Sequence, residues 1–170
     1  MGNDITLVDQ ALRAMAVREG KYLTFSLDAE EYGIEILKVK EIVGMMNITR
    51  IPQAPAYIKG VVNLRGKVIP VVDLRLKFGL DAMDYTERTC IIVVEILAGD
   101  KNMAVGVIVD SVSEVINIRG NDIQETPAFG GHVNTDYILG MAKTNGGVKI
   151  LLDIDRVLSS AEITVLEQII

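Results

Sequence analysis

The chain has 170 residues, of which 49% are apolar and 24% charged, a composition typical of a globular protein and not of a disordered one. Its net charge is −6 and no stretch concentrates lysine and arginine, so binding to the phosphate backbone of a nucleic acid is not expected. A chain of this length buries about 70% of its unfolded surface and needs no metal or disulfide; its one cysteine, Cys90, cannot form an internal disulfide.

The start of the chain carries no targeting signal. Residues 1–19 are mixed in polarity, with apolar residues at helical spacing between Leu7 and Val17, and they lack the basic and apolar regions of a secretory signal. Nowhere do about 18 apolar residues follow one another, as a bilayer-spanning helix requires. We therefore expect a cytoplasmic protein without direct membrane insertion, in which residues 1–19 form an N-terminal extension.

From residue 20 the apolar pattern changes to period two, which is typical of half-buried strands. Side chains alternate from Tyr22 to Leu27, a polar turn follows at residues 28–31, and a return strand runs from Tyr32 to Ile36. Residues 37–43 fit a short helix or turn. Further strands, separated by turn residues at short intervals, are predicted at residues 58–64, 67–73, 89–96, 103–109, 137–143 and 148–153.

The chain contains an internal repeat, which occurs only twice and is therefore not a solenoid. In its first part the offset is 73 residues, and the matching pairs are Gly33 and Gly106, Val39 and Val112, and Glu41 and Glu114. In its second part the offset is 80 residues, and the pairs include Tyr57 and Tyr137, Gly60 and Gly140, Gly66 and Gly146, and Asp73 and Asp153. The simplest architecture is two similar β lobes that face each other. We expect them at about residues 20–88 and 89–158, within one domain that spans residues 20–160.

Residues 159–170 are predicted to form a C-terminal helix. Ser159 and Glu162 have the spacing of a capping box, in which a hydroxyl and a carboxylate satisfy the first free amides of a helix. Apolar residues that follow lie along one helical face, namely Ile163, Leu166, Ile169 and Ile170. We expect this face to pack on the body of the protein and not on a partner.

No segment has the residue pattern of an enzyme, and we expect neither a catalytic nor a metal site. Residues 60–67, GVVNLRGK, are not a phosphate-binding loop, because five residues separate the glycines and Val68 stands where a magnesium-binding hydroxyl residue belongs. His132, the only histidine, has no nucleophile at motif distance and no second histidine with which to share a metal. Asp73, Asp110 and Asp153 follow apolar strands, and two of them are repeat partners, which favours a turn-capping role.

Charged residues set among apolar ones in the first repeat are better suited to binding. Glu41, Lys59 and Arg65 lie near the ends of predicted strands. A guanidinium group binds a carboxylate with two parallel hydrogen bonds, and this carboxylate could be that of Glu41 or an acid of a partner. An ordinary surface ion pair is the alternative. Gly60 either lets a partner helix approach closely or relieves a strand bulge.

The segment from Tyr32 to Gly79 resembles the CheW family of chemotaxis coupling proteins. The resemblance is carried by EILKVKEI at residues 35–42, IKG at 58–60, NLRG at 63–66 and PVVDLR at 70–75, and it extends from about residue 21 to residue 158. It implies a mainly β fold of two pseudo-repeat, five-stranded SH3-like barrel lobes with short helices, to which the predicted C-terminal helix is added. It also implies a non-catalytic adaptor that needs no cofactor.

Members of this family bind the cytoplasmic tip of methyl-accepting chemoreceptors and the regulatory domain of the histidine kinase CheA. The resemblance therefore implies both partners and recruitment to membrane-associated chemoreceptor arrays. It implies a receptor-binding groove at the positions of Val39, Glu41, Lys59, Gly60 and Arg65. Kinase contacts are implied at Ile48, on the far edge of the first lobe, and at Phe129 in the second lobe, where an aromatic residue in a Gly-rich loop suits an exposed anchor.

Two other functions are alternatives. A CheV-type coupler or another receptor–kinase scaffold with a CheW-like module needs a fused domain, for which we expect no room here, although the sequence leaves a longer parent protein open. A small-ligand-binding or hydrolytic β-barrel enzyme needs a pocket with convergent polar groups, and the sequence offers only His132.

Overall fold

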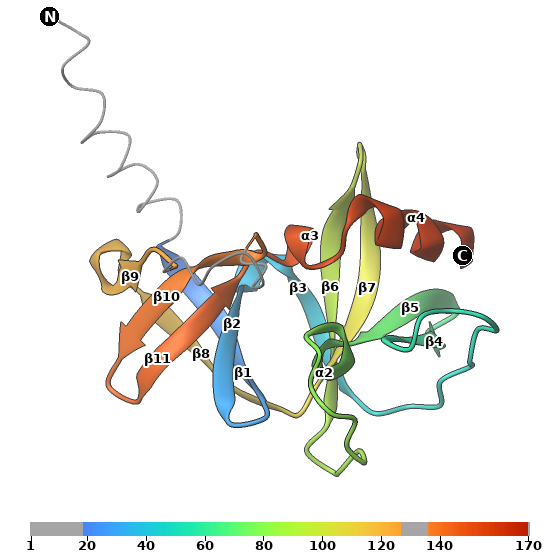
Figure 1. Cartoon of the computed structure of the whole chain (residues 1–170), viewed down its shortest axis with the longest axis horizontal. Coiled ribbons are helices and arrows are strands. Elements are labelled where there is room, and N and C mark those ends of the chain that lie inside the picture. The colour runs from blue at the N-terminus through green and yellow to red at the C-terminus, as the bar shows by residue number, and fades with distance from the viewer. Residues whose placement is uncertain (1–18, 127–135, 170) are drawn as a thin grey trace, which may run out of the picture.

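The computed structural model describes residues 19–126 and 136–169, which form two twisted β sheets with short helices against them (Figure 1). The first elements are β1 (Gly20–Leu27), β2 (Glu30–Glu35), the 3₁₀ helix η1 (Ile36–Lys38), β3 (Val39–Gly44), β4 (Ile58–Leu64), β5 (Lys67–Asp73) and α2 (Leu74–Lys77). The later strands are β6 (Cys90–Ala98), β7 (Lys101–Val109), β8 (Ser111–Ile118), β9 (Ile123–Gln124), β10 (Ile138–Thr144) and β11 (Gly147–Leu152). The later helices are η2 (Gly120–Asp122), α3 (Ile154–Val157) and α4 (Ser160–Ile169). None of the helices in these ranges has the length and apolarity that crossing a bilayer requires.

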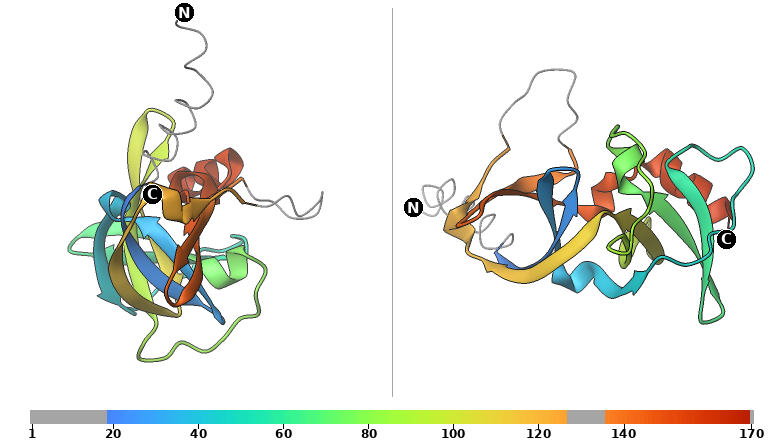
Figure 2. Two further views of the ribbon diagram at one scale, coloured as in Figure 1. Left: turned by 90° about the vertical axis from the view of Figure 1, so that its left-hand side faces the viewer. Right: turned by 90° about the horizontal axis from the view of Figure 1, so that it is seen from below.

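The two sheets exchange strands between the repeats. One has the order β3-β6-β7-β5-β4 and the other the order β8-β1-β2-β11-β10-β9. Neighbours are antiparallel except for β5 with β7 and β2 with β11, in which the repeat partners Gly106 and Gly33 face Val71 and Leu151. In Figures 1 and 2 the blue β1 and β2 accordingly stand beside the orange β10 and β11. The predicted lobes at about residues 20–88 and 89–158 therefore differ from the sheets, because the first two strands of each repeat pair with the last strands of the other.

The repeat itself is confirmed by matching hydrogen bonds. The backbone N–H of Asp73 donates to the carbonyl of Tyr57 at 2.7 Å, and that of Asp153 donates to the carbonyl of Tyr137 at 2.8 Å. Both aspartate carboxylates also accept a backbone N–H of the short helix that follows, α2 or α3. The turn-capping role predicted for these two residues is therefore confirmed.

Three apolar cores hold the molecule together. The largest lies between the sheets and takes side chains from the strands β1, β2, β4, β5, β6, β7 and β11 and from the helices α2, α3 and α4. The five-stranded sheet encloses a second core of Val62, Ile69, Val71, Ile91, Val93 and Ile108. The six-stranded sheet encloses a third, of Tyr22, Ile118, Ile123, Ala142 and Leu151. Each sheet thus curls around a core of its own, which confirms the mainly β, two-lobed fold class.

The strand count differs from the prediction in one lobe. Its sixth strand is β9, which has two residues and pairs with β10. The counterpart in the other sheet is a single bridge between Thr49 and Val61. Five long strands and one short edge segment are therefore common to both lobes.

The predicted C-terminal helix packs on the body of the protein as α4. The hydroxyl of Ser159 accepts the Glu162 N–H at 3.2 Å, and the Glu162 carboxylate accepts the Ser159 N–H at 2.8 Å. This is the expected capping box. Leu166 is fully buried, and Ile163 and Ile169 pack against the core between the sheets.

Candidate docking surface

Arg65 reaches from the β4–β5 turn to Glu41 of β3, across the two outer strands of the five-stranded sheet. The turn has two central residues, Arg65 with φ 51° and Gly66 with φ 86°, which is the left-handed geometry that two-residue hairpins favour. The side-chain oxygen of Asn63 accepts the Gly66 N–H at 2.8 Å and fixes the turn. The sequence NLRG therefore aims the arginine towards β3.

The Glu41–Arg65 pair is bidentate. Nη1 of Arg65 lies 3.1 Å from Oε1 of Glu41, and Nη2 donates to Oε2. Hydrogen bonding to Arg65 holds the pKa of Glu41 below its ordinary value, and the same bond raises the pKa of Arg65. The Arg65 side chain is still 70% exposed, against 30% for Glu41. The guanidinium thus has its carboxylate within the chain and keeps further N–H donors in solvent.

A groove of about 270 Å³ adjoins this pair. Its apolar lining comes from the five-stranded sheet, through Leu64, Ile69, Val93 and Ala104. Its charged lining consists of Lys40, Glu41, Arg65 and Lys67. An apolar floor with a polar rim is the usual build of a protein–protein contact.

Gly60 has a structural role at the edge of the same sheet. It is buried with φ 141°, and the register of β4 against β5 shifts between Ile58 and Gly60. A Cβ atom at this position would lie 2.0 Å from the carbonyl oxygen of Thr49, which accepts the Val61 N–H at 2.9 Å. Gly60 therefore has the predicted role at a strand bulge, and the backbone that approaches it closely is that of Thr49 in the same chain.

Val39 and Lys59 lie apart from the ion pair. Val39 pairs with Val94 and is half-buried against the core between the sheets. Lys59 holds its ammonium 5.9 Å from the ring centroid of Tyr85. Since a strand rises about 3.3 Å per residue, Lys59 lies about 20 Å from Arg65 along β4. Of the five residues assigned to the receptor groove, Glu41 and Arg65 are joined by an ion pair.

Tyr85 belongs to this surface although no sequence pattern marks it. Its hydroxyl donates to the buried carboxylate of Asp73 at 3.1 Å, so its ring is fixed beneath Lys59. Burial raises the pKa of Tyr85 well above its ordinary value, and the Asp73 carboxylate adds to the effect. The loop after α2 thereby positions one of the predicted docking residues.

The two predicted kinase-contact residues are placed differently. Ile48 is half-buried and packs against the core of the five-stranded sheet. Phe129 lies outside the described residues, as does His132. Both assignments stay predictions.

Asp110 and Cys90 form hydrogen bonds within the chain. Asp110 accepts hydrogen bonds from Arg75 and from the Asp28 N–H, both at 2.7 Å. The Cys90 thiol donates to the Arg88 carbonyl at 3.2 Å. Within residues 19–126 and 136–169, no three His, Cys, Asp or Glu side chains are grouped so that they could hold a metal ion.

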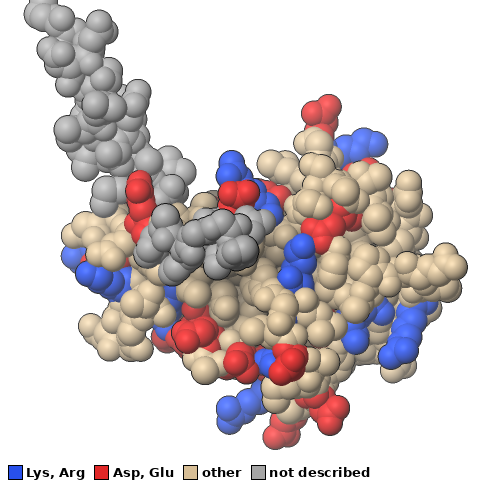
Figure 3. Space-filling model, in the orientation of Figure 1, with Lys and Arg blue, Asp and Glu red and all other residues tan. Residues whose placement is uncertain are grey.

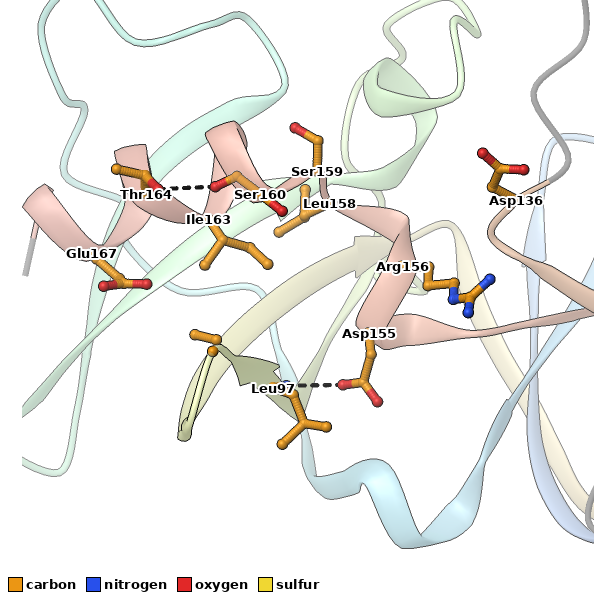
Figure 4. A pocket seen from close by; sticks show the side chains of 12 residues that line it. Leu97, Asp136, Asp155, Arg156, Leu158, Ser159, Ser160, Ile163, Thr164 and Glu167 are labelled. Atoms are coloured by element: carbon orange, nitrogen blue, oxygen red, sulfur yellow. Dashed lines mark hydrogen bonds between the residues drawn. The ribbon is translucent and has the colours of Figure 1, made fainter.

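Another cavity, of about 730 Å³, lies between the β6–β7 turn and the helices α3 and α4 (Figure 4). Asp155 projects from α3 and accepts the Leu97 N–H at 2.9 Å, and it also pairs with Lys38 at 2.7 Å. These contacts tie the helix to the five-stranded sheet. Neither a histidine nor a cysteine is among the described residues that line the cavity.

Comparison with known proteins finds relatives along most of the chain. Residues 21–162 match the family model of the CheW-like domain. The chain is 40% identical over 149 residues to the chemotaxis protein CheW of Klebsiella aerogenes, covering 88% of this chain and 87% of that protein. It is 35% identical over 140 residues to the chemotaxis protein CheW of Rhizobium meliloti, with 82% and 88% covered. The crystal structure of the scaffolding protein TtCheW from Thermoanaerobacter tengcongensis is similar with a TM-score of 0.74 and 38% identity, covering 85% of this chain and 97% of that one.

Proposed function

This chain belongs to the CheW-like family, and we propose that it is a non-catalytic adaptor that couples methyl-accepting chemoreceptors to the histidine kinase CheA. The observation that carries the proposal is the family match over residues 21–162, which includes strands of both sheets. The relatives described above are named as chemotaxis or scaffolding proteins, and none of the three is named for a catalytic activity. These names favour the adaptor over a hydrolytic enzyme and over a module of a CheV-type coupler.

The proposed receptor contact is the groove between β3 and the β4–β5 hairpin. An acidic side chain on the receptor tip would meet the exposed N–H donors of Arg65 that Glu41 leaves free. Lys59, held on the Tyr85 ring, adds a second positive charge about 20 Å away. Charges of both signs are interspersed over the face drawn in Figure 3, so local pairs and not one large field would set specificity.

The proposed kinase contacts are Phe129 and Ile48, and Ile48 is not among the residues that line the groove beside Arg65. Separate faces allow both partners to be bound at once in a cytoplasmic array beneath the membrane. Signalling would then follow from coupling between receptor binding and kinase binding. The strength of the array would come from several modest contacts that act together.

The first test is receptor binding by an Arg65→Ala variant. We expect the variant to bind a receptor cytoplasmic fragment about tenfold more weakly, as loss of an interface arginine commonly costs 1–2 kcal/mol. Binding to purified CheA should be unchanged. Isothermal titration calorimetry with each partner measures both affinities.

Arg88→Ala is the matched control, because Arg88 is exposed and its side chain makes no hydrogen bond or ion pair to the described residues. Receptor affinity of Arg65→Ala equal to that of Arg88→Ala would show that the groove is wrongly assigned. Binding of the unmodified chain to neither partner would overturn the adaptor itself.

A further inference from the structure

A second groove, matching the first, lies in the six-stranded lobe. It has a volume of about 410 Å³ and runs between β8 and the β10–β11 hairpin. β8 is an outer strand like β3, and β10–β11 is the repeat of the β4–β5 hairpin. The groove is lined by Glu114, Ile116, Asn117, Ile118, Asp122, Lys143, Thr144, Asn145, Gly146 and Lys149. The proposed receptor and kinase contacts use none of these residues.

Both grooves have a glutamate at the same place in the repeat, but only the first groove has an arginine to pair with it. The 73-residue offset puts Glu114 where the first groove has Glu41, and the 80-residue offset puts Asn145 where it has Arg65. Asparagine is shorter and uncharged, and the second groove is the larger, at about 410 Å³ against 270 Å³. The first lobe fills its groove with its own guanidinium, whereas the second leaves that place open.

Glu114 is held in position by its backbone. The hydroxyl of the fully buried Thr24 donates to the Glu114 carbonyl at 2.8 Å and accepts the Glu114 N–H at 3.1 Å. These bonds lie at a register shift between β1 and β8, and β3 has a corresponding shift next to Glu41. Glu114 and Glu41 therefore lie next to matching register shifts in the two lobes, and the hydrogen bonds to Thr24 fix the backbone from which the Glu114 side chain extends.

The other charges of the groove leave this carboxylate without a counter-ion. Lys149, 8% exposed, pairs with Glu31 of the neighbouring strand β2. Lys143 and Asp122 are exposed at the rim, and neither forms an ion pair with a described residue. The Glu114 carboxylate likewise has no hydrogen-bond or ion-pair partner in the described ranges.

We propose that this groove is a docking site for an arginine-bearing segment of a partner protein. Its guanidinium would bind Glu114 as Arg65 binds Glu41, with a planar fork that matches the carboxylate. The chain thus carries in its first lobe a model of the ligand that its second lobe accepts. The inference rests on the duplicated geometry and is independent of the proposed function.

The test is an NMR titration of the full chain with a blocked pentapeptide Asn-Leu-Arg-Gly-Lys, the sequence of residues 63–67. A second peptide carries citrulline in place of arginine, which keeps the shape and removes the charge. We expect saturable shifts of the amide signals of Glu114 and Asn145 with the first peptide. Affinity for the citrulline peptide should be about tenfold lower, because a charge-assisted bidentate contact is lost.

Two variants and a control make the assignment specific. Glu114→Gln should lose the preference for arginine over citrulline, and Asn145→Arg should block the groove with a guanidinium of its own. Glu167→Gln, at an exposed acid on α4, should bind like the unmodified chain. Absent shifts, equal affinity for both peptides, or unchanged binding by Glu114→Gln or Asn145→Arg would overturn the proposal. If the amide signals of Glu114 and Asn145 shift when the protein alone is diluted, the groove is occupied by a second copy of the chain, and the proposal of a separate partner protein is wrong.

Discussion

The glycines at positions 60 and 140 mark where each lobe packs its short edge segment onto a hairpin. A Cβ atom on Gly60 would lie 2.0 Å from the Thr49 carbonyl oxygen, and one on Gly140 would lie 2.8 Å from that of Gln124. Backbone oxygens cannot rotate away as a side chain can, so these contacts require glycine. The repeat has thus kept the same steric solution at both edges.

Gly60→Ala should therefore lower the free energy of unfolding by about 2–4 kcal/mol, through the clash and the strained backbone. Gly66→Ala is the matched control, since Gly66 also has a positive φ, 86°, but no neighbouring atom within 4 Å of the added methyl. Its cost should be only about 1 kcal/mol. Urea unfolding of both variants measures the difference, and equal losses would contradict the steric explanation. Docking by a Gly60 variant therefore has to be compared with the stability of that variant.

Among the elements, α4 depends on a partly buried ion pair at its first turn. Lys77 of α2 lies 2.8 and 2.7 Å from the two carboxylate oxygens of Glu162. Burial by itself raises the pKa of Glu162, but hydrogen bonds from Lys77, Ser159 and Tyr57 outweigh it and lower the pKa to about 2. The helix that covers the core between the sheets is thus fastened by a carboxylate that must stay charged.

This fastening predicts a defined loss of stability in acid. Because the pKa of Glu162 falls from 4.5 to about 2 on folding, its contribution is complete above pH 4.5 and is lost as the pH drops towards 2. Between pH 6 and pH 3 the unmodified chain should lose about 1–2 kcal/mol more unfolding free energy than Glu162→Gln. Urea unfolding at both pH values measures this, with Glu167→Gln as the control that keeps the full loss. Parallel losses in the unmodified chain and Glu162→Gln would contradict the pairing.

The strands show what local pattern can and cannot predict. Residues 58–64 and 67–73 were predicted as strands with the bounds of β4 and β5, because alternating apolar residues and a glycine turn specify a hairpin. The outer strands β3 and β8 were not predicted, since a register shift interrupts the alternation of each. The sequence left open whether Arg65 binds the carboxylate of Glu41 or an acid of a partner, so the Glu41–Arg65 pair was one of two interpretations. The contacts of Gly60 and Tyr85 could not be predicted, because they are made with segments that are distant in the sequence.

For the whole molecule, Arg75 links the two lobes. Its side chain is 8% exposed and lies in α2, beside the five-stranded sheet. Nη1 lies 2.7 Å from Asp110, in the link between β7 and β8, and Nη2 lies 3.5 Å from Asp28 in the β1–β2 turn. One guanidinium therefore joins three segments that belong to different sheets. Its burial makes the pair costly to break, because one charge would be left without a partner.

Arg75→Met should lower the free energy of unfolding by about 1.5–3 kcal/mol, because it removes the charged hydrogen bonds of the arginine while Asp110 and Asp28, 31% and 59% exposed, remain accessible to water. Combined with Asp110→Asn, the loss should be smaller than the sum of the single losses, by about 0.5–3 kcal/mol. A double-mutant cycle by urea unfolding measures this coupling. Additive losses would mean that the two residues act independently.

How strands pair across the repeats could not be predicted from the sequence. Both repeats have the same local pattern, so β1–β2 can in principle complete either sheet. The choice is made by tertiary contacts such as the parallel pair β2–β11 and the Arg75 link. The predicted lobes followed the order of the chain, because the sequence does not indicate which strands of one repeat pair with strands of the other.

The exchange of strands also sets the order in which a nascent chain can be completed. The five-stranded sheet is drawn entirely from residues 39–109, so all of its pairings are available once β7 has left the ribosome. The β1–β2 hairpin is made first, yet its neighbours β8 and β11 are made after that sheet, and at 5–20 residues per second the wait for β11 is roughly ten seconds. Meanwhile Leu23, Phe25 and Ile34 can bury themselves only against the finished sheet, with which they share the central core. The β1–β2 hairpin, which is translated first, therefore belongs to the sheet that is completed last.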